Sequence, residues 1–260
     1  MPSLQQRQSS PWWRRYISLV GLLLIWEGAS RGGLIPAYYA PPPSLVLVTV
    51  FQLAVEGTLW PHLAISLFRA FAGFSIGASL GILLGVLAGS SRLVSDLADV
   101  PLQVLRAVPL AALVPMAILW FGVDEGSKVF IVALPPFFLC FINSMQGVRH
   151  ADASLVRAAR SLGANQRQIL LRVLVPAASP SIFAGIRLGV VVSMVMLVIA
   201  EMIAAGAGLG YYILEAHRLW MTEQMFAGVA VISALGFLFD RAVVWTESRV
   251  LRWTAPEQVS

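Results

Sequence analysis

The sequence is poor in charged residues, in lysine and in cysteine. Only 12% of its 260 residues are charged and 58% are hydrophobic, whereas an ordinary soluble domain has about 25% charged residues. This composition excludes a disordered chain, a collagen-like fibre and a typical soluble enzyme. The single cysteine, Cys140, excludes a disulfide scaffold and a cysteine-based metal cluster. A polytopic membrane protein remains, with the lipid bilayer as its surroundings.

The net charge of +5 does not indicate a nucleic-acid partner. Lys128 is the only lysine among the 18 basic residues, and the sequence has no dense basic run. A nucleic-acid-binding surface normally needs clustered basic residues. We therefore expect no nucleic acid among the partners.

The sequence also lacks the common catalytic and metal-binding motifs. It has no G-x-x-x-x-G-K-[ST] loop for a nucleotide and no H-E-x-x-H pair, and its three histidines are scattered. The glycines at 206, 208 and 210 are followed by no Lys-Ser or Lys-Thr and predict a tight turn. We expect no catalytic residue, no metal site and no cofactor in this chain.

Apolar stretches long enough to cross a bilayer recur along the chain. A hydrocarbon core of about 30 Å requires roughly 20 apolar residues per helix. The spans that we expect cover residues 16–34, 70–91, 107–123, 129–148, 181–205 and 224–239. The prolines at 101, 109 and 115 should break the third span, and Pro135-Pro136 should interrupt the fourth. The sequence therefore predicts an all-α membrane protein with six transmembrane helices.

Prolines also set the structure after the first span. Residues 34–43 include three consecutive prolines and two tyrosines, which predict an extended loop at the membrane interface. We expect a short helix from Ser44 to Glu56, capped by Ser44. The first span could instead be a cleaved signal peptide, but five further spans make a separate export signal unnecessary. We expect it to stay as a helix.

The distribution of basic residues predicts the orientation of the chain. With the N-terminus inside, 13 basic residues lie on the inner side and 3 on the outer side. Inner loops of membrane proteins carry an excess of Lys and Arg. We therefore expect both termini to be cytoplasmic.

The longest polar segment between spans, residues 149–176, lies on the predicted inner side. Two short helices fit there: Ala153–Leu162, ended by a left-handed cap at Gly163, and a second that begins after Asn165 and is stopped by Pro176. Spacing alone leaves open an amphipathic linker that lies on the membrane surface.

The motif in this segment favours a functional loop over such a linker. Residues 157–176 read R-A-A, three residues, Gly163, nine residues, Val173, one residue, Val175, Pro176. This pattern resembles the E-A-A-x3-G-x9-I-x-L-P loop of ATP-binding-cassette (ABC) importer permeases. Arg157 departs from the usual Glu, which puts in doubt any ion pair made by the first motif residue.

The resemblance covers most of the chain. Residues 59–85, 108–130 and 199–213 are similar to the branch of type I ABC importer permeases that carries aliphatic sulfonates, taurine, nitrate or bicarbonate. The resemblance implies a permease domain over residues 59–252, after a first helix and interfacial segment over 16–58. Residues 1–15 and 253–260 are then cytoplasmic ends, and the chain lies in the bacterial inner membrane.

The resemblance also implies partners. These are a second copy of the chain, two cytoplasmic ATPase subunits that hold ATP and Mg, and a periplasmic or lipid-anchored substrate-binding protein. The first helix of the motif loop would be the coupling helix that the ATPase contacts. The residues expected to couple transport to the ATPase are Arg157, Ala158, Ala159, Ser161, Leu162, Gly163 and Pro176.

Charged residues inside the predicted spans have two interpretations. Such residues usually face the bundle interior or water, or pair near the ends of spans. We expect Glu27 and Arg187 to be paired. Arg69 and Glu201 both fall toward the outer side, and a cationic Arg69 could serve an anionic cargo in the translocation pathway.

Glycine recurs every fourth residue from Gly73 to Gly85 in the second span. This pattern lets helices approach closely. We expect these glycines to pack within the bundle, with a dimer interface as the alternative.

The expected function is that of a permease subunit that imports a small organic anion, most closely an aliphatic sulfonate or taurine, with ATP hydrolysed by a partner. Nitrate, bicarbonate or another small solute is the alternative cargo. A secondary transporter would need internal repeats, and the sequence shows no clear duplication. A membrane-embedded enzyme would need a catalytic constellation, which the sequence lacks.

Overall fold

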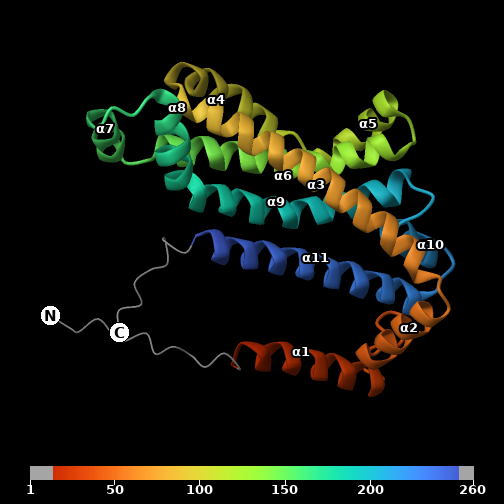
Figure 1. The fold of residues 1–260 in the computed structure, drawn as a ribbon. Coiled ribbons are helices and arrows are strands. Elements are labelled where there is room, and N and C mark those ends of the chain that lie inside the picture. Colours follow the sequence, from red (N-terminus) through yellow and green to blue (C-terminus); the bar gives the residue numbers. More distant parts are fainter. Residues whose placement is uncertain (1–13, 252–260) are drawn as a thin grey trace.

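A computed structural model describes residues 14–251, and every regular element within that range is a helix (Figure 1). Residues 1–13 and 252–260 are not described. The expected cytoplasmic ends therefore fall almost wholly outside the described residues.

The helices are short at the two ends of the fold and long between them. They are α1 (Arg14–Arg31), α2 (Pro43–Val55), α3 (Leu59–Ser90), α4 (Arg92–Ala107), the 3-10 turn η1 (Leu110–Leu113), α5 (Val114–Phe121), α6 (Glu125–Arg149), α7 (Ala153–Ser161), α8 (Gln166–Ile169), the π-helical η2 (Leu170–Leu174), α9 (Val175–Ala204), α10 (Leu209–Arg218) and α11 (Thr222–Val250).

Four helical runs among the described residues are long and apolar enough to cross a membrane. They are α3, α6, the continuous run 166–204 and α11. The first expected span corresponds to α1, an 18-residue helix that contains Glu27. The third, residues 107–123, corresponds to η1 and α5, which form a shorter apolar helical stretch, and α4 precedes it.

The long helices lie lengthwise beside one another (Figure 1). The loop helices α7 and α8 are at one end of this bundle, which we call the loop end. The helices α2 and α10 are at the opposite end, which we call the outer end. Helix α11 ends near the loop end, and α1 starts on the same side of the bundle but farther from α7 and α8 (Figure 1).

Helix α6 lies between α3 and α9, and glycines allow this close approach. A Cβ atom at Gly77, Gly81 or Gly85 of α3 would collide with carbonyl oxygens of α6. On the other side of α6, a Cβ atom at Gly189 of α9 would lie 3.0 Å from Pro136 Cα. The glycine repeat of α3 therefore packs within the bundle.

The prolines act only in part as expected. Helix α6 continues through Pro135 and Pro136, which are both fully buried, so the fourth span is not interrupted. Proline inside a helix costs about 3 kcal/mol in isolation, and here the packing of α3 and α9 on both sides of α6 maintains the helix. The third span does break before η1, next to Pro109, whereas Pro101 lies inside α4.

Helix α2 begins at Pro43, one residue earlier than expected, and Ser44 does not cap it. The Ser44 hydroxyl and backbone N–H instead donate to the Glu27 carboxylate, at 2.7 and 3.0 Å. The side chain therefore satisfies a carboxylate of α1, while Pro42 and Pro43 set the helical start through their fixed φ.

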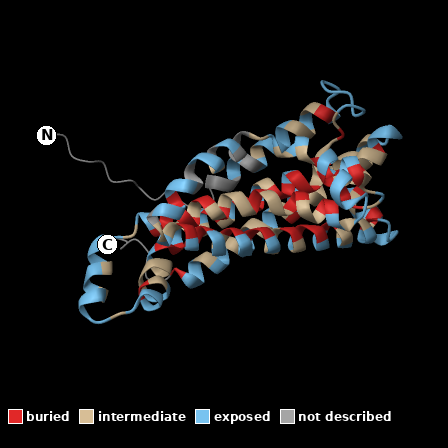
Figure 2. Ribbon diagram, turned by 90° about the horizontal axis from the view of Figure 1, so that it is seen from above, coloured by how far each residue is buried: buried red, intermediate tan, exposed pale blue. Residues whose placement is uncertain are grey.

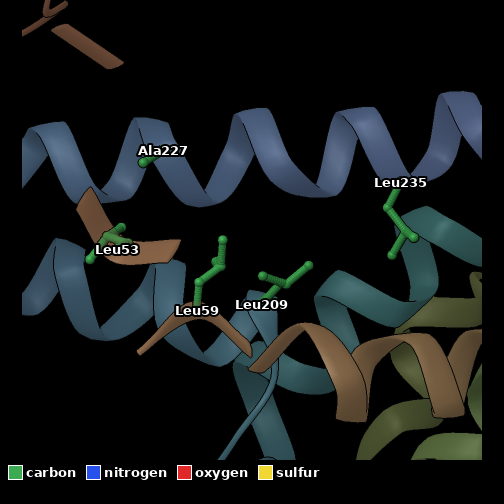
Figure 3. Close-up of a cluster of buried hydrophobic side chains, with 5 residues drawn as sticks. All are labelled: Leu53, Leu59, Leu209, Ala227 and Leu235. Atoms are coloured by element: carbon green, nitrogen blue, oxygen red, sulfur yellow. The ribbon is translucent and has the colours of Figure 1, made fainter. Parts of the chain in front are cut away.

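The apolar core is concentrated between the long helices, and the outward faces of the bundle are exposed (Figure 2). At the outer end a separate cluster joins α2, α3, α10 and α11. Figure 3 shows its five buried side chains: Leu53, Leu59, Leu209, Ala227 and Leu235. This cluster fixes α10 against the beginning of α3.

The glycine contacts predict a steric cost for larger side chains. Replacing Gly81 with Leu should destabilise the protein by about 1–3 kcal/mol, the usual cost of overpacking, because the Phe137 carbonyl and Cys140 leave no room for a side chain. Thermal unfolding in detergent measures the effect. Gly28→Leu is the matched control, since a Cβ atom there has no neighbour within 4 Å. Equal unfolding temperatures for the two variants would contradict the packing of α3 on α6.

Candidate functional site

Local hydrogen bonds fix the two ends of α7. At its start, the Asp152 carboxylate accepts from the Ser154 backbone N–H at 2.7 Å. This hydrogen bond is the main reason that the pKa of Asp152 lies below its ordinary value. At its end, Gly163 has a φ of +81° and donates to the Arg160 carbonyl. The left-handed cap predicted at Gly163 is confirmed.

The motif residues lie on an exposed helix. No residue of α7 is buried, and Leu162 directly after it is 88% exposed. The structure brings together the motif residues from Arg157 to Gly163 on α7 and its C-terminal cap. Pro176 lies apart from them, in the first turn of α9.

The second loop helix begins as expected and ends differently. Asn165 and Gln168 form a reciprocal capping box at its start. Pro176 does not stop the helix, because the chain continues from α8 through the π-helical η2 into α9. Proline is tolerated in the first turn of a helix, where no backbone N–H is needed.

A second polar site lies at the outer end of the bundle, where Arg69 of α3 meets Glu201 of α9. Arg69 Nη1 lies 2.9 Å from Glu201 Oε1, and the two side chains are 2% and 0% exposed. Arg69 Nη1 also donates to the Ala207 carbonyl at 2.6 Å. The structure therefore pairs the two residues that the sequence placed on the outer side.

Two further charged residues, which the sequence analysis did not propose as site residues, complete this cluster. The Glu125 carboxylate accepts from Arg69 Nε and Nη2 at 2.6 and 2.7 Å. Lys128 Nζ lies 3.4 Å from Glu125 and 2.8 Å from the Val123 carbonyl. The Glu125 side chain is 46% exposed, whereas those of Arg69 and Lys128 are buried. Their sequence signal is a short charged run just before the apolar stretch of α6.

The turn between α9 and α10 is built around Glu201. Its carboxylate accepts from the Ser66 hydroxyl at 2.7 Å and from the Gly210 N–H at 2.8 Å. Gly208 has a φ of +125°, and a Cβ atom there would collide with this carboxylate. The expected tight glycine turn is present, and the close approach to Glu201 requires its glycine.

The other two charges predicted inside spans are paired. Arg31 lies 2.5 Å from Glu27, and Arg187 Nε lies 3.2 Å from Asp240 Oδ1. Within residues 14–251, no group of three or more His, Cys, Asp or Glu residues could hold a metal ion.

Comparison with known proteins extends these observations. Residues 81–252 match the family described as binding-protein-dependent transport system inner membrane component. The permease SsuC of Bacillus subtilis (strain 168), named for aliphatic sulfonates transport, is 38% identical over 95% of this chain and 91% of its own length. The taurine transport system permease protein TauC of Escherichia coli (strain K12) is 34% identical over 91% of this chain and 88% of its own length. The nitrate import permease protein NrtB of a Synechocystis strain is 30% identical over 92% of this chain and 89% of its own length.

Solved structures with the same fold include a crystal structure of an amino acid ABC transporter with histidines, at 19% identity. It covers 79% of this chain and 97% of its own, with a TM-score of 0.60. An inward-facing structure of the MetNI methionine ABC transporter has a TM-score of 0.59, also at 19% identity. It covers 77% of this chain and 97% of its own. This likeness concerns the fold.

The family match covers more than half of the chain, and relatives above 30% identity extend over nearly all of it. The long apolar helices agree with a location in the inner membrane. The chain belongs to the inner-membrane permease components of binding-protein-dependent ABC importers, and it is a transport subunit, not an enzyme.

Proposed function

We propose that this chain is the permease subunit of an importer for a small organic anion, with an aliphatic sulfonate or a taurine-like compound as cargo. The observation that carries this proposal is the similarity to SsuC and TauC over almost the whole chain. Nitrate is the second candidate cargo, because NrtB matches over a similar length at lower identity.

We propose six membrane crossings with both termini in the cytoplasm. The start of α1 and the end of α11 both point toward the loop end, where α7 and α8 lie (Figure 1). An even number of crossings returns the chain to its starting side. The arginine excess at this end supports a cytoplasmic position for it.

We also propose that the chain pairs with a second copy and with two ATPase subunits that hold ATP and Mg, and that it receives cargo from a binding protein. The exposed helix α7 supports an ATPase contact. Leu155 and Leu162 are large apolar residues left in solvent by the single chain, and Ala158 between them lets a partner approach closely. The proposed coupling residues are Arg157, Ala158, Ala159, Ser161, Leu162, Gly163 and Pro176.

The helical run 166–204 offers a route for coupling. It contains 39 residues and extends from α8 at the loop end to Glu201 at the outer end. A displacement of the loop helices by the ATPase would therefore act on the same helix that carries Glu201. Such a change is a shift between two packed states, biased by a ligand bound to the partner.

The coupling proposal predicts that Gly163→Asp separates ATP hydrolysis from uptake. The substitution puts a carboxylate and a strained left-handed residue at the end of α7, where no neighbouring atom lies within 4 Å. We expect ATPase activity to continue in the reconstituted complex while cargo uptake falls at least about tenfold, equivalent to 1.4 kcal/mol of lost coupling.

Gly33→Asp is the matched control for this variant. Gly33 has a φ of +74°, also lies in open space, and follows α1 at the outer end. It carries the same strain and charge away from α7, so uptake should stay near the wild-type rate. Normal uptake by Gly163→Asp would refute the coupling assignment.

We propose that Arg69 and Glu201 lie beside the translocation pathway, with Arg69 as the cation toward which an anionic cargo is drawn. The fork of Arg69 already binds the half-exposed Glu125 carboxylate in a bidentate manner. Guanidinium groups bind carboxylates and other oxyanions through the same donors, so an anionic cargo would bind Arg69 by displacing Glu125. The pairing with Glu201 holds Arg69 in place for this contact.

This proposal is tested by keeping the buried charge pair and changing the donors. Arg69→Ala would leave Glu201 buried without its cation, at a cost of about 3–5 kcal/mol, so loss of uptake in this variant would report only misfolding.

Arg69→Lys retains the charge and loses the planar fork of donors. We expect folded protein with lower uptake and altered preference among anions, measured by competition. Arg218→Lys, at an exposed outer position, is the matched control, because it makes the same substitution away from this cluster. Unchanged rate and anion preference in Arg69→Lys would remove Arg69 from the pathway.

The cargo class is tested by ATPase activity of the complex in nanodiscs. We expect binding protein loaded with an alkanesulfonate to stimulate hydrolysis above the rate with empty binding protein. Stimulation by nitrate-loaded and not by sulfonate-loaded binding protein would change the cargo and retain the importer. If no ATPase copurifies with the chain, the proposed assembly fails.

A further inference from the structure

A cavity of about 600 Å³ lies behind α7, between this helix and the loop end of the bundle. Its walls come from the end of α3, from α4, from the end of α6 and from α7 itself. The coupling proposal includes one of its lining residues, Arg157, but assigns no role to the cavity itself.

The cavity is lined by an excess of positive charge. Arg149, Arg157 and Arg160 line it, together with His150 and one carboxylate, Asp96. Asp96 Oδ1 lies 3.7 Å from Arg149 Nη2. Among the side chains that the structure describes, no carboxylate forms an ion pair with Arg157 or Arg160. Among the side chains described along this cavity there are thus three guanidinium groups and one carboxylate.

Another acid close to α7 in the sequence, Asp152, does not neutralise this excess by direct contact. Asp152 precedes α7, and its carboxylate accepts from the Ser154 backbone N–H. The charge of Arg157 contributes to lowering the pKa of Asp152, but the hydrogen bond from Ser154 is the larger cause. Asp152 is thus the N-terminal cap of α7, and it is not among the residues that line the cavity.

Helix α7 presents its arginines and its apolar residues on different faces. Ala153, Val156, Arg157 and Arg160 line the cavity and follow the helical spacing of three, four and seven. Leu155, Ala158 and Leu162 follow the same spacing on a neighbouring face. The residue that replaces the usual Glu of the motif, Arg157, therefore faces the cavity and lies off the leucine face.

We propose that this cavity binds a tetrahedral oxyanion, a phosphate or a sulfonate group, held by Arg157 and Arg160 from α7 and by Arg149 from α6. Planar guanidinium forks match the oxygens of such groups and give charge-assisted hydrogen bonds. Bound there, the anion joins α7 to the end of α6. The same group can come from the headgroup of an anionic phospholipid or from a soluble ion.

The first experiment uses the full chain in nanodiscs of zwitterionic lipid. Binding of inorganic phosphate and of methanesulfonate is measured separately by calorimetry. We expect saturable binding of at least one of the two ions, together with slower amide hydrogen exchange in residues 149–162. Arg157→Gln combined with Arg160→Gln should weaken this binding at least about tenfold, through the loss of charge-assisted hydrogen bonds.

Arg167→Gln combined with Arg172→Gln is the matched control. Both arginines belong to the same loop region and are exposed, but neither lines the cavity. The control pair removes the same charge and should bind the ions as the wild type does. Thermal unfolding checks that both double variants fold. If the first pair misfolds, the single variants Arg157→Lys and Arg160→Lys replace it, because they retain charge and lose the fork.

A second arm identifies the source of the oxyanion. The same measurements are repeated in nanodiscs that contain phosphatidylglycerol. Weaker ion binding there, with slow exchange at residues 149–162 before any ion is added, assigns the cavity to a lipid headgroup. Unchanged ion binding assigns it to a soluble ion. Absence of saturable binding together with equal exchange in both lipids would overturn the proposal. Equal weakening by the control pair would also overturn it, because it would show only diffuse surface charge.

Discussion

The close approach of α6 to α3 on one side and to α9 on the other is the constraint on which the rest of the structure depends. Glycines of α3 and α9 bring backbone against backbone, and the carbonyl oxygens of α6 occupy the space that side chains would take. In a bilayer, where lipid tails are as apolar as leucine, such packing is a principal source of helix association. The same contacts let α6 remain a helix through two consecutive buried prolines.

The outer ion cluster follows from this packing. Arg69, Glu125 and Glu201 lie on three different helices, and their carboxylates reach one guanidinium only if α3, α6 and α9 have a fixed register. A charge in a low-dielectric interior is costly without a partner, whereas a satisfied cluster specifies one arrangement. The helix contacts position the charges, and the charges in turn fix the turn that leads into α10.

Local rules in the sequence anticipated much of this structure. The four-residue spacing of glycine from Gly73 to Gly85 indicated helix packing, and both Gly163 and Asn165 cap helices where their conformational preferences predicted. Features that depend on tertiary packing could not be predicted from the neighbouring residues alone. Pro135-Pro136 and Pro176 lie within continuous helical runs because neighbouring helices, or the position at a helix start, offset the missing N–H groups. In the sequence, Glu125 and Lys128 resemble the ordinary polar residues at the end of a membrane span. Nothing in the neighbouring residues shows that Arg69, on a different helix, lies opposite them.

The π-helical segment η2 has a geometric consequence for the whole run from Gln166 to Ala204. At about 1.5 Å per residue, 39 residues span about 58 Å, roughly twice the hydrocarbon thickness of a bilayer. A π segment is a single wider turn with hydrogen bonds five residues apart. One residue added to a turn changes the angular position of everything before it by about 100°. The π segment therefore sets how α8 is rotated about the helix axis relative to α9. This rotation decides the direction in which the loop helices leave the bundle, and it does not depend on which face α9 buries against α6.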